Sequence, residues 1–212
     1  MGPQMPVRRA CEGNDAAIAR WLRTRFPTIA MDAKRDKAVI YWGDDMGLRS
    51  DHVAGTSYAP MGQTPIIRAI GQRFGGDTIS AITNRGHPAF IVFHGKLDGR
   101  LFVQFIRCLF QQATGKLYLI VDGRPVHRSV VARDFVAGNE AKLCRIRLAD
   151  YCPEYKPDEL LNQDVRTNGL GKSCPANRAE LMAGVLSHLR RQQKRPQVIP
   201  NLFREKHVRY AA

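Results

Sequence analysis

Two aspartates stand just after short apolar segments of the sequence. Asp122 directly follows Leu117–Val121, and Asp44 follows Ala38–Trp42 after a single glycine. Neither segment carries a charge, which is typical of a short strand buried on both faces. A third acidic residue, Glu159, lies where prolines give way to helical spacing, as at the start of a helix. Because Mg²⁺ and Mn²⁺ prefer oxygen ligands, this set predicts a divalent-metal site for phosphoryl transfer.

The acidic residues and their neighbours also have more ordinary interpretations. Strand-end aspartates often cap a following helix, and Asp158 would replace Glu159 as a ligand if the helix began one residue earlier. We interpret Asp45 as a supporting or capping group. His127 either orients DNA or the loop that holds Asp122, or is an ordinary structural histidine.

Three blocks of the sequence, Ile40–Asp51, Leu117–Ser129 and Tyr151–Val165, resemble the catalytic blocks of DDE transposases. The likeness is to the mariner-related bacterial insertion-sequence group, the IS-six-thirty family. Its blocks commonly run hydrophobic-Asp-Glu, hydrophobic-Asp-Asn-x-x-x-His and Tyr-x-Pro-Glu-Leu-Asn-Pro-x-Glu. The resemblance covers nearly the whole chain. The sequence departs from the family's pattern at Asp45, where Glu is usual, and at Gly123-Arg124, where Asn-Ala is common.

Carried over residue by residue, the resemblance implies that Asp44, Asp122 and Glu159 are catalytic and bind two Mg²⁺ or Mn²⁺ ions. Asp44 would contact both ions, and the other two acids would each complete one metal site. The implied reaction is cleavage of double-stranded DNA at a transposon end by water. A DNA 3′-hydroxyl would then attack target DNA, with the protein acting as a homodimer. Since three such carboxylates repel one another without metal, we expect Asp122→Asn to leave the metal-free chain at least as stable as the wild type.

Two other functions stay open at this point. One is a non-catalytic, DNA-binding remnant of a transposase gene, which would bind DNA without cutting it. The other is a different ribonuclease-H-like nuclease, for example one that cuts RNA in a hybrid. Both would use the same fold, so the sequence blocks alone do not separate them from a transposase.

Composition and charge narrow the class of protein. The 212 residues are 44% apolar, enough for one domain with its own core. The formal charge of +14 favours a polyanionic partner such as nucleic acid over a merely solvated basic surface. The cysteines include no Cys-x-x-Cys pair and indicate neither a disulfide framework nor a zinc site. This fits a reducing bacterial cytoplasm and association with the nucleoid. We expect no membrane partner, because no apolar run is long enough for a span.

Several basic residues are candidates for DNA contacts. Two follow Asp122 in the same loop, namely Arg124 and Arg128. Four more form either a DNA-facing patch or an ordinary solvated helix end: Arg190, Arg191, Lys194 and Arg195.

One further motif resembles a phosphate-binding loop. Gly169–Ser173 ends like that motif, but Arg166 stands where its first glycine belongs and no buried strand precedes it. We therefore expect no nucleotide binding.

The order of predicted elements is that of an α/β, ribonuclease-H-like fold with a mixed five-stranded sheet flanked by helices. An antiparallel meander would start with the strand over 38–42 and return near 52–58, before a hairpin of strands over 77–83 and 88–94. A helix over 100–113 would cross over to the strand that ends at Asp122. Further helices are predicted over 127–137, from about 157 and over 176–193, and an edge strand over 141–148.

The sequence divides into three regions. Residues 1–36 are interpreted as a lead-in with one helix, the connection to a preceding DNA-reading region. Asn14 would cap this helix, which would run through about Arg25 and be ended by Pro27. Residues 37–175 form the catalytic domain. Residues 176–212 form a C-terminal helix and a basic tail, and Asn177 and Glu180 have the spacing of a capping box at the start of that helix.

Overall fold

The computed structural model describes residues 15–51, 60–63, 66, 71–86, 88–148, 153–171, 173–195 and 197–212. Its strands are β1 Val39–Arg49, β2 Gly75–Ile82, β3 Ala89–Phe93, β4 Leu117–Val121 and β5 Leu143–Arg147. Its α-helices are α1 Asp15–Arg20, α2 Phe26–Arg35, α3 Gly99–Gln112, α4 Val130–Ala137, α5 Pro157–Asp164, α6 Arg178–Gln193 and α7 Val198–Leu202. Within the described ranges, no helix is both long and apolar enough to cross a membrane.

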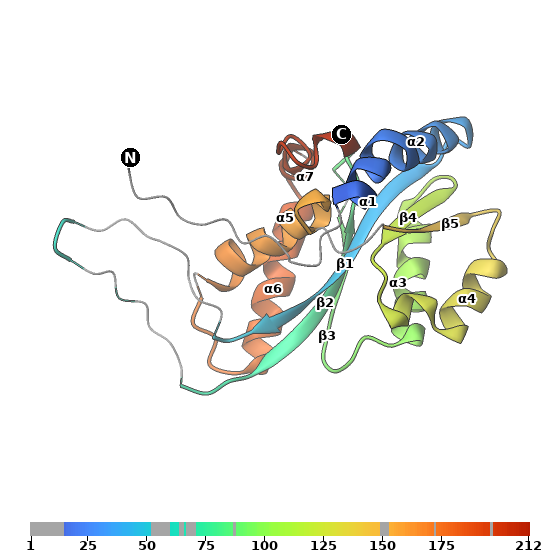
Figure 1. Cartoon of the computed structure of the whole chain (residues 1–212). Coiled ribbons are helices and arrows are strands. Elements are labelled where there is room, and N and C mark those ends of the chain that lie inside the picture. The colour runs from blue at the N-terminus through green and yellow to red at the C-terminus, as the bar shows by residue number, and fades with distance from the viewer. Residues whose placement is uncertain are drawn as a thin grey trace.

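The strands form one mixed sheet in the order β3-β2-β1-β4-β5 (Figure 1). The pairs β1–β2 and β2–β3 are antiparallel, whereas β1–β4 and β4–β5 are parallel. The helix α3 makes the crossover from β3 to β4, as its apolar spacing predicts. The α/β fold with a mixed five-stranded sheet is therefore confirmed, and the predicted edge strand is β5.

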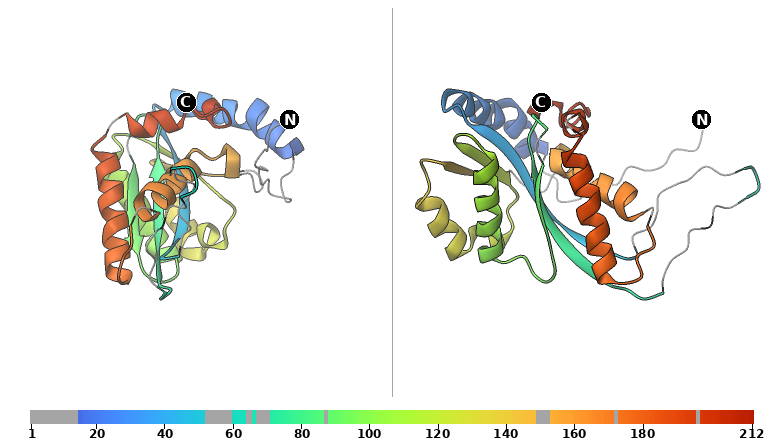
Figure 2. Two further views of the ribbon diagram at one scale, coloured as in Figure 1. Left: turned by 90° about the vertical axis from the view of Figure 1, so that its left-hand side faces the viewer. Right: turned by 180° about the vertical axis from the view of Figure 1, so that it is seen from behind.

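Helices cover both faces of the sheet. In Figure 1 and Figure 2, α3 and α4 lie on one face and α5 and α6 on the other. Each face has its own apolar core, because side chains along a strand point alternately to opposite sides. The α3 side includes Tyr41, Ile79 and Phe105, and the α6 side includes Trp42 and Leu189.

The strand β1 is longer than predicted. It was expected to end at Trp42 but continues to Arg49, because β2 pairs with it as far as Gly75. Met46 and Leu48 extend its apolar face and are both almost fully buried. The antiparallel partner of β1 is β2, and the predicted return segment at 52–58 lies outside the described residues.

The N-terminal helix does not end at Pro27. A π-helical turn, Trp21–Arg25, links α1 to α2, and the backbone N–H of Phe26 donates to the carbonyl of Trp21. Proline lacks an N–H and its ring crowds the preceding turn of a helix. The wider π turn accommodates it, so Pro27 lies in the first turn of α2.

The described part of this lead-in belongs to the core rather than standing outside it. Trp21 and Phe26 are buried and pack with Trp42 of β1 and with Tyr210 near the C-terminus. The ring centroids of Phe26 and Tyr210 are 4.9 Å apart in an edge-to-face arrangement.

The C-terminal segment is likewise packed against the core, through Ile199, Phe203 and Ala211. The helix cap by Asn177 is confirmed, since its side chain accepts from the backbone N–H of Glu180, and α6 begins one residue later than Asn177. The Glu180 carboxylate accepts from the backbone N–H of Ala176. After α6 the chain turns back, and α7 and the C-terminal end lie beside α1 and α2 (Figure 2). The Tyr210 hydroxyl donates to the carbonyl of Tyr155 at 2.7 Å and accepts from the indole of Trp21 at 3.2 Å.

We predict that Phe203→Ala lowers the free energy of unfolding by about 3–5 kcal/mol, because this ring is almost fully buried and its loss leaves a cavity. Urea denaturation measures the change. Met31→Ala is the matched control, since 71% of Met31 is exposed and its removal should change little. Equal stability of Phe203→Ala and the wild type would show that the C-terminal segment does not pack as described.

Candidate active site

The register of β1 with β4 places two of the predicted site residues side by side. The parallel pairing runs from Val39↔Leu117 to Trp42↔Ile120. Asp44 lies two residues beyond Trp42, and Asp122 lies two residues beyond Ile120, so both stand at the same level on neighbouring strands. Asp44 is not at a strand end, as the sequence predicted, but inside β1, where it pairs with Ser80.

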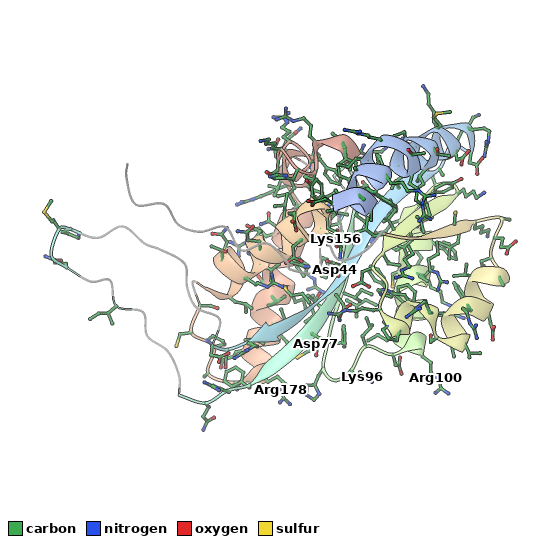
Figure 3. The ribbon with its side chains drawn as sticks, in the orientation of Figure 1. Asp44, Asp77, Lys96, Arg100, Lys156 and Arg178 are labelled. Atoms are coloured by element: carbon green, nitrogen blue, oxygen red, sulfur yellow. The ribbon has the colours of Figure 1, made fainter. Side chains whose placement is uncertain are left out.

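Asp44 faces α5 and is buried, with 8% of its surface exposed. One carboxylate oxygen, Oδ1, lies 2.9 Å from Nζ of Lys156, and Asn162 Nδ2 donates to the other, Oδ2, at 3.2 Å. Figure 3 shows Asp44 and Lys156 together where β1 passes α5. Both oxygens of Asp44 therefore have a hydrogen-bond donor from the α5 region.

Glu159 reaches the same place from α5. The amide Nδ2 of Asn162, which contacts Asp44, also donates to Glu159 Oε2 at 3.2 Å. The other oxygen, Oε1, forms an ion pair with Arg166 at 2.8 Å. Asn162 thus bridges Asp44 and Glu159, and it is one of the residues that the sequence analysis missed.

Asp122 is held by the short 3-10 turn Pro125–Arg128, which precedes α4 where a single helix was predicted. His127 Nδ1 lies 3.0 Å from Asp122 Oδ1, and the backbone N–H of Arg124 donates to the same oxygen at 3.0 Å. Burial alone would raise the pKa of Asp122, but the hydrogen bonds from His127 and Arg124 outweigh it and lower the pKa to about 2.

This pairing argues against the expectation that Asp122→Asn leaves the metal-free chain at least as stable as the wild type. His127 and the backbone N–H of Arg124 stabilise the anionic form of Asp122. Substitution by Asn removes that favourable interaction, so we expect it to lower the stability of the metal-free chain.

His127 serves the Asp122 loop. Only 2% of it is exposed, its ring packs 4.7 Å from that of Phe102, and its carbonyl accepts from Arg145. Its contact with Asp122 fits the role of orienting the Asp122 loop.

Asp45 points to the opposite face of β1 from Asp44 and pairs with Arg124. Burial raises the pKa of Asp45, and the positive charge of Arg124 partly offsets this. Arg124 also lies 3.5 Å from Asp122 through Nε, so it bridges two carboxylates and has 55% of its side chain exposed. This arginine, predicted to contact DNA, is tied to the acidic residues in the structure.

The remaining basic candidates lie on the surface. Arg128 is exposed, and α6 carries the other basic residues near its C-terminal end. Three of them, with Ala183, Leu186 and Ser187, line an open pocket on the outer side of α6: Arg190, Arg191 and Lys194.

Lys156 is the functional candidate that sequence reasoning missed most clearly. It is buried, and its Nζ lies 3.5 Å from Asp158 Oδ2 as well as 2.9 Å from Asp44. Burial would lower the pKa of Lys156, but Asp158 and Asp44 raise it overall. The signal in the sequence was a lysine directly before Pro157 and the acid pair, where the family pattern quoted above has Asn.

Asp158 and Glu159, adjacent in sequence, differ sharply in their surroundings. Asp158 is fully buried, and among the described residues neither of its carboxylate oxygens has a well-aligned hydrogen-bond partner. Burial raises the pKa of Asp158. Glu159 has 31% of its side chain exposed and contacts Asn162 beside Asp44. Glu159 is therefore the more accessible of the two carboxylates that the sequence left as alternatives.

The oxygen-rich set of side chains suits Mg²⁺ or Mn²⁺ by its chemistry. In the part of the chain that the structure describes, however, no three His, Cys, Asp or Glu side chains gather as a ready-made metal site. The three proposed ligands are instead paired with separate side chains: Lys156 for Asp44, His127 and Arg124 for Asp122, and Arg166 for Glu159. Metal binding would have to replace these partners.

The pKa of Asp44 generates a prediction about stability and pH. Burial first, and repulsion from Asp158 second, raise this pKa from 3.8 to about 8. The folded state therefore binds more protons than the unfolded state between these values, so stability falls as pH rises from about 4 to about 8. Asp44→Asn should reduce this fall by at least about 1 kcal/mol.

Urea denaturation at pH 5 and pH 8 in excess chelator measures this effect. Asp32→Asn, at a partly exposed position on α2, should behave as the wild type. A pH dependence that Asp44→Asn leaves unchanged would contradict the raised pKa of Asp44.

Comparison with solved structures shows the fold. The Mos1 transposase paired-end complex with left transposon end matches with a TM-score of 0.63 at 15% identity, covering 100% of this chain and 68% of that chain. The Mos1 transposase catalytic domain with Raltegravir and Mn matches with a TM-score of 0.57 at 12% identity, covering 96% and 98%. At these identities the likeness establishes the ribonuclease-H-like fold alone.

Sequence comparison gives the family. No curated protein matches the chain significantly. Residues 39–182, which hold all three predicted catalytic acids, match the DDE superfamily endonucleases. Because this match spans more than half of the sequence, the chain belongs to the DDE superfamily endonuclease family.

Proposed function

We propose that this chain is the catalytic part of a transposase of the mariner-related bacterial insertion-sequence group, which cleaves DNA strands at a transposon end and transfers them to target DNA. The observation that carries the proposal is the convergence of Asp44 and Glu159 on Asn162, with Asp122 level with Asp44 on the next strand. Family membership and the charge of +14 support a nuclease that acts on DNA.

In this proposal Asp44, Asp122 and Glu159 are the ligands of two divalent ions, Mg²⁺ or Mn²⁺. When bound, such ions stabilise the attacking and leaving oxygens of an in-line displacement at phosphorus. By the family resemblance, Asp44 would contact both ions, and Asp122 and Glu159 would each complete one metal site. His127 and the Arg124 backbone hold the Asp122 carboxylate in place, and Asn162 holds Asp44 and Glu159 together. Mos1 structures that include Mg or Mn support this choice of ions.

The proposed partner is double-stranded DNA, both a transposon end and a target, bound by a homodimer in the bacterial cytoplasm at the nucleoid. Support comes from the Mos1 complex with left transposon end and from the basic surface of this chain. Residues 37–175 would be the catalytic domain, joined through the N-terminal helices to a DNA-reading region. The exposed basic residues of α6, with Arg195 and Arg128, would contact DNA phosphates.

One observation favours a second candidate, a DNA-binding protein of this family that does not cut. Each proposed metal ligand already has a cationic partner, so a chain that never exchanges these partners for metal would bind DNA without cleaving it. Nicking of DNA by the purified chain separates the two functions.

We predict that cleavage of a matching transposon-end duplex requires Mg²⁺ or Mn²⁺. Asp44→Ala, Asp122→Ala and Glu159→Ala should each reduce it roughly 100-fold or more, because each removes a group that stabilises the charged transition state. Gel assays on end-labelled duplexes measure the rate. Asp32→Ala, a partly exposed acid on α2, should cleave as the wild type does.

Cleavage by any of the three variants at the wild-type rate would contradict the assignment of that acid. Cleavage by the wild type in excess chelator would contradict metal dependence altogether. Binding without cleavage under all metal conditions would favour the non-catalytic alternative.

We also predict that DNA affinity falls steeply with salt and that the α6 region carries much of this dependence. Replacing its four basic residues by alanine should reduce the slope of log K against log salt by about 0.9 for each DNA phosphate that the variant no longer binds. Fluorescence anisotropy over a salt series measures it. The variant changes Arg190, Arg191, Lys194 and Arg195.

A control variant removes the same charge from the exposed surface of the N-terminal helices, at Arg20, Arg23, Lys34 and Lys37. If the control lowers the slope as much as the α6 variant, net charge rather than the α6 surface determines binding. A strong preference for terminal-repeat over scrambled duplex would show that this chain itself reads sequence.

A further inference from the structure

The ammonium of Lys156 occupies a defined place inside the acidic site. Its side chain is only 9% exposed, and it lies between Asp44, which is 10% exposed, and Asp158, which is fully buried. The backbone fixes this position: Lys156 precedes Pro157, which favours the extended conformation found there, and its carbonyl accepts from the Glu159 N–H. This lysine is therefore a built-in part of the site and not a mobile surface side chain.

A single ammonium faces two buried carboxylates at this place. When both are ionised, one positive charge compensates only part of their negative charge, and burial of an uncompensated charge is strongly unfavourable. Lys156 is thus the group that makes burial of Asp44 and Asp158 tolerable when no other cation is near. A divalent ion bound at Asp44 would supply the same compensation with twice the charge.

Lys156 and a divalent ion would repel each other if both contacted the same oxygen of Asp44. Nζ already lies 2.9 Å from Oδ1, so an ion bound to that oxygen would bring two positive charges close together. Asp158 offers the ammonium a second acceptor, since its Oδ2 lies only 3.5 Å from Nζ. Within the described residues, neither oxygen of Asp158 has a hydrogen-bond partner that would prevent this move.

We propose that Lys156 is an internal counter-ion that competes with the divalent metal ion for the carboxylate of Asp44 and shifts onto Asp158 when metal binds. Lys156 holds the acidic residues together without metal, and it raises the metal concentration at which the site fills. It is a positioning residue that acts through Asp44. This inference rests on the proposed function, because it requires that Asp44 binds metal.

The test compares Lys156→Met, which keeps an unbranched side chain one atom shorter but not its charge, with Lys156→Arg, which keeps a positive charge. Mn²⁺ binding is measured by electron paramagnetic resonance on the full chain without DNA, and the melting temperature is measured in excess chelator. Lys156→Met should bind Mn²⁺ about tenfold more tightly or better, while its metal-free melting temperature falls. Lys156→Arg should stay close to the wild type in both measurements.

A matched control is Lys116→Met, because Lys116 also forms an ion pair, with Asp36 at 2.8 Å, but lies outside the site. It should leave Mn²⁺ affinity unchanged. If Lys156→Met does not fold, Lys156→Gln removes the same charge while retaining a hydrogen-bond donor for Asp44, and it should also bind Mn²⁺ more tightly than the wild type.

The opposite directions of the two readouts separate competition from a purely structural role. A neutral variant that melts lower and binds Mn²⁺ equally or more weakly overturns the inference, while the proposed metal site stands as long as the wild type binds Mn²⁺. If neither the wild type nor a folded neutral variant binds Mn²⁺, the inference and the proposed function both fail. Mn²⁺ binding by the neutral variant alone supports both.

Discussion

The parallel pairing of β1 with β4 is the interaction on which the site depends. Its register brings Asp44 and Asp122 to the same level, and the antiparallel pairing with β2 keeps β1 extended through Asp44. Asn162 of α5 and Lys156, which directly precedes α5, then contact Asp44 from one face of the sheet. A shift of one residue in this register would turn Asp44 to the other face of the sheet.

Hydrogen bonds and ion pairs to the three acids explain most of the side chains around them. Asp44 contacts Lys156, Asp122 contacts His127, and Glu159 contacts Arg166. Each acid therefore has its own partner from another part of the chain. Metal binding would have to displace these partners. The acidic site and its cations are therefore best understood as one unit.

Local patterns in the sequence predicted the features that depend on residues close together in the chain. The apolar run of β4, the spacing of α3 and the Asn177 cap of α6 each depend on neighbouring residues, and all were found. The extension of β1 was missed because it depends on pairing with Gly75–Ile82, far away in sequence. The packing of the C-terminal segment was missed for the same reason, because Tyr210 accepts a hydrogen bond from Trp21, which lies near the other end of the sequence. Resemblance to a family located the acids, but it did not reveal Lys156 among them, because that residue departs from the pattern.

The central claim is that Asp44 and Asp122 hold a catalytic metal ion between neighbouring strands. Anomalous X-ray diffraction from crystals of this protein containing Mn²⁺ tests it most directly. We expect an Mn²⁺ peak with carboxylate oxygens of both Asp44 and Asp122 as ligands, at about 2.0–2.6 Å, the range of metal–oxygen distances for such ions. Mn²⁺ bound only elsewhere on the chain, with Lys156 still on Asp44, would contradict it.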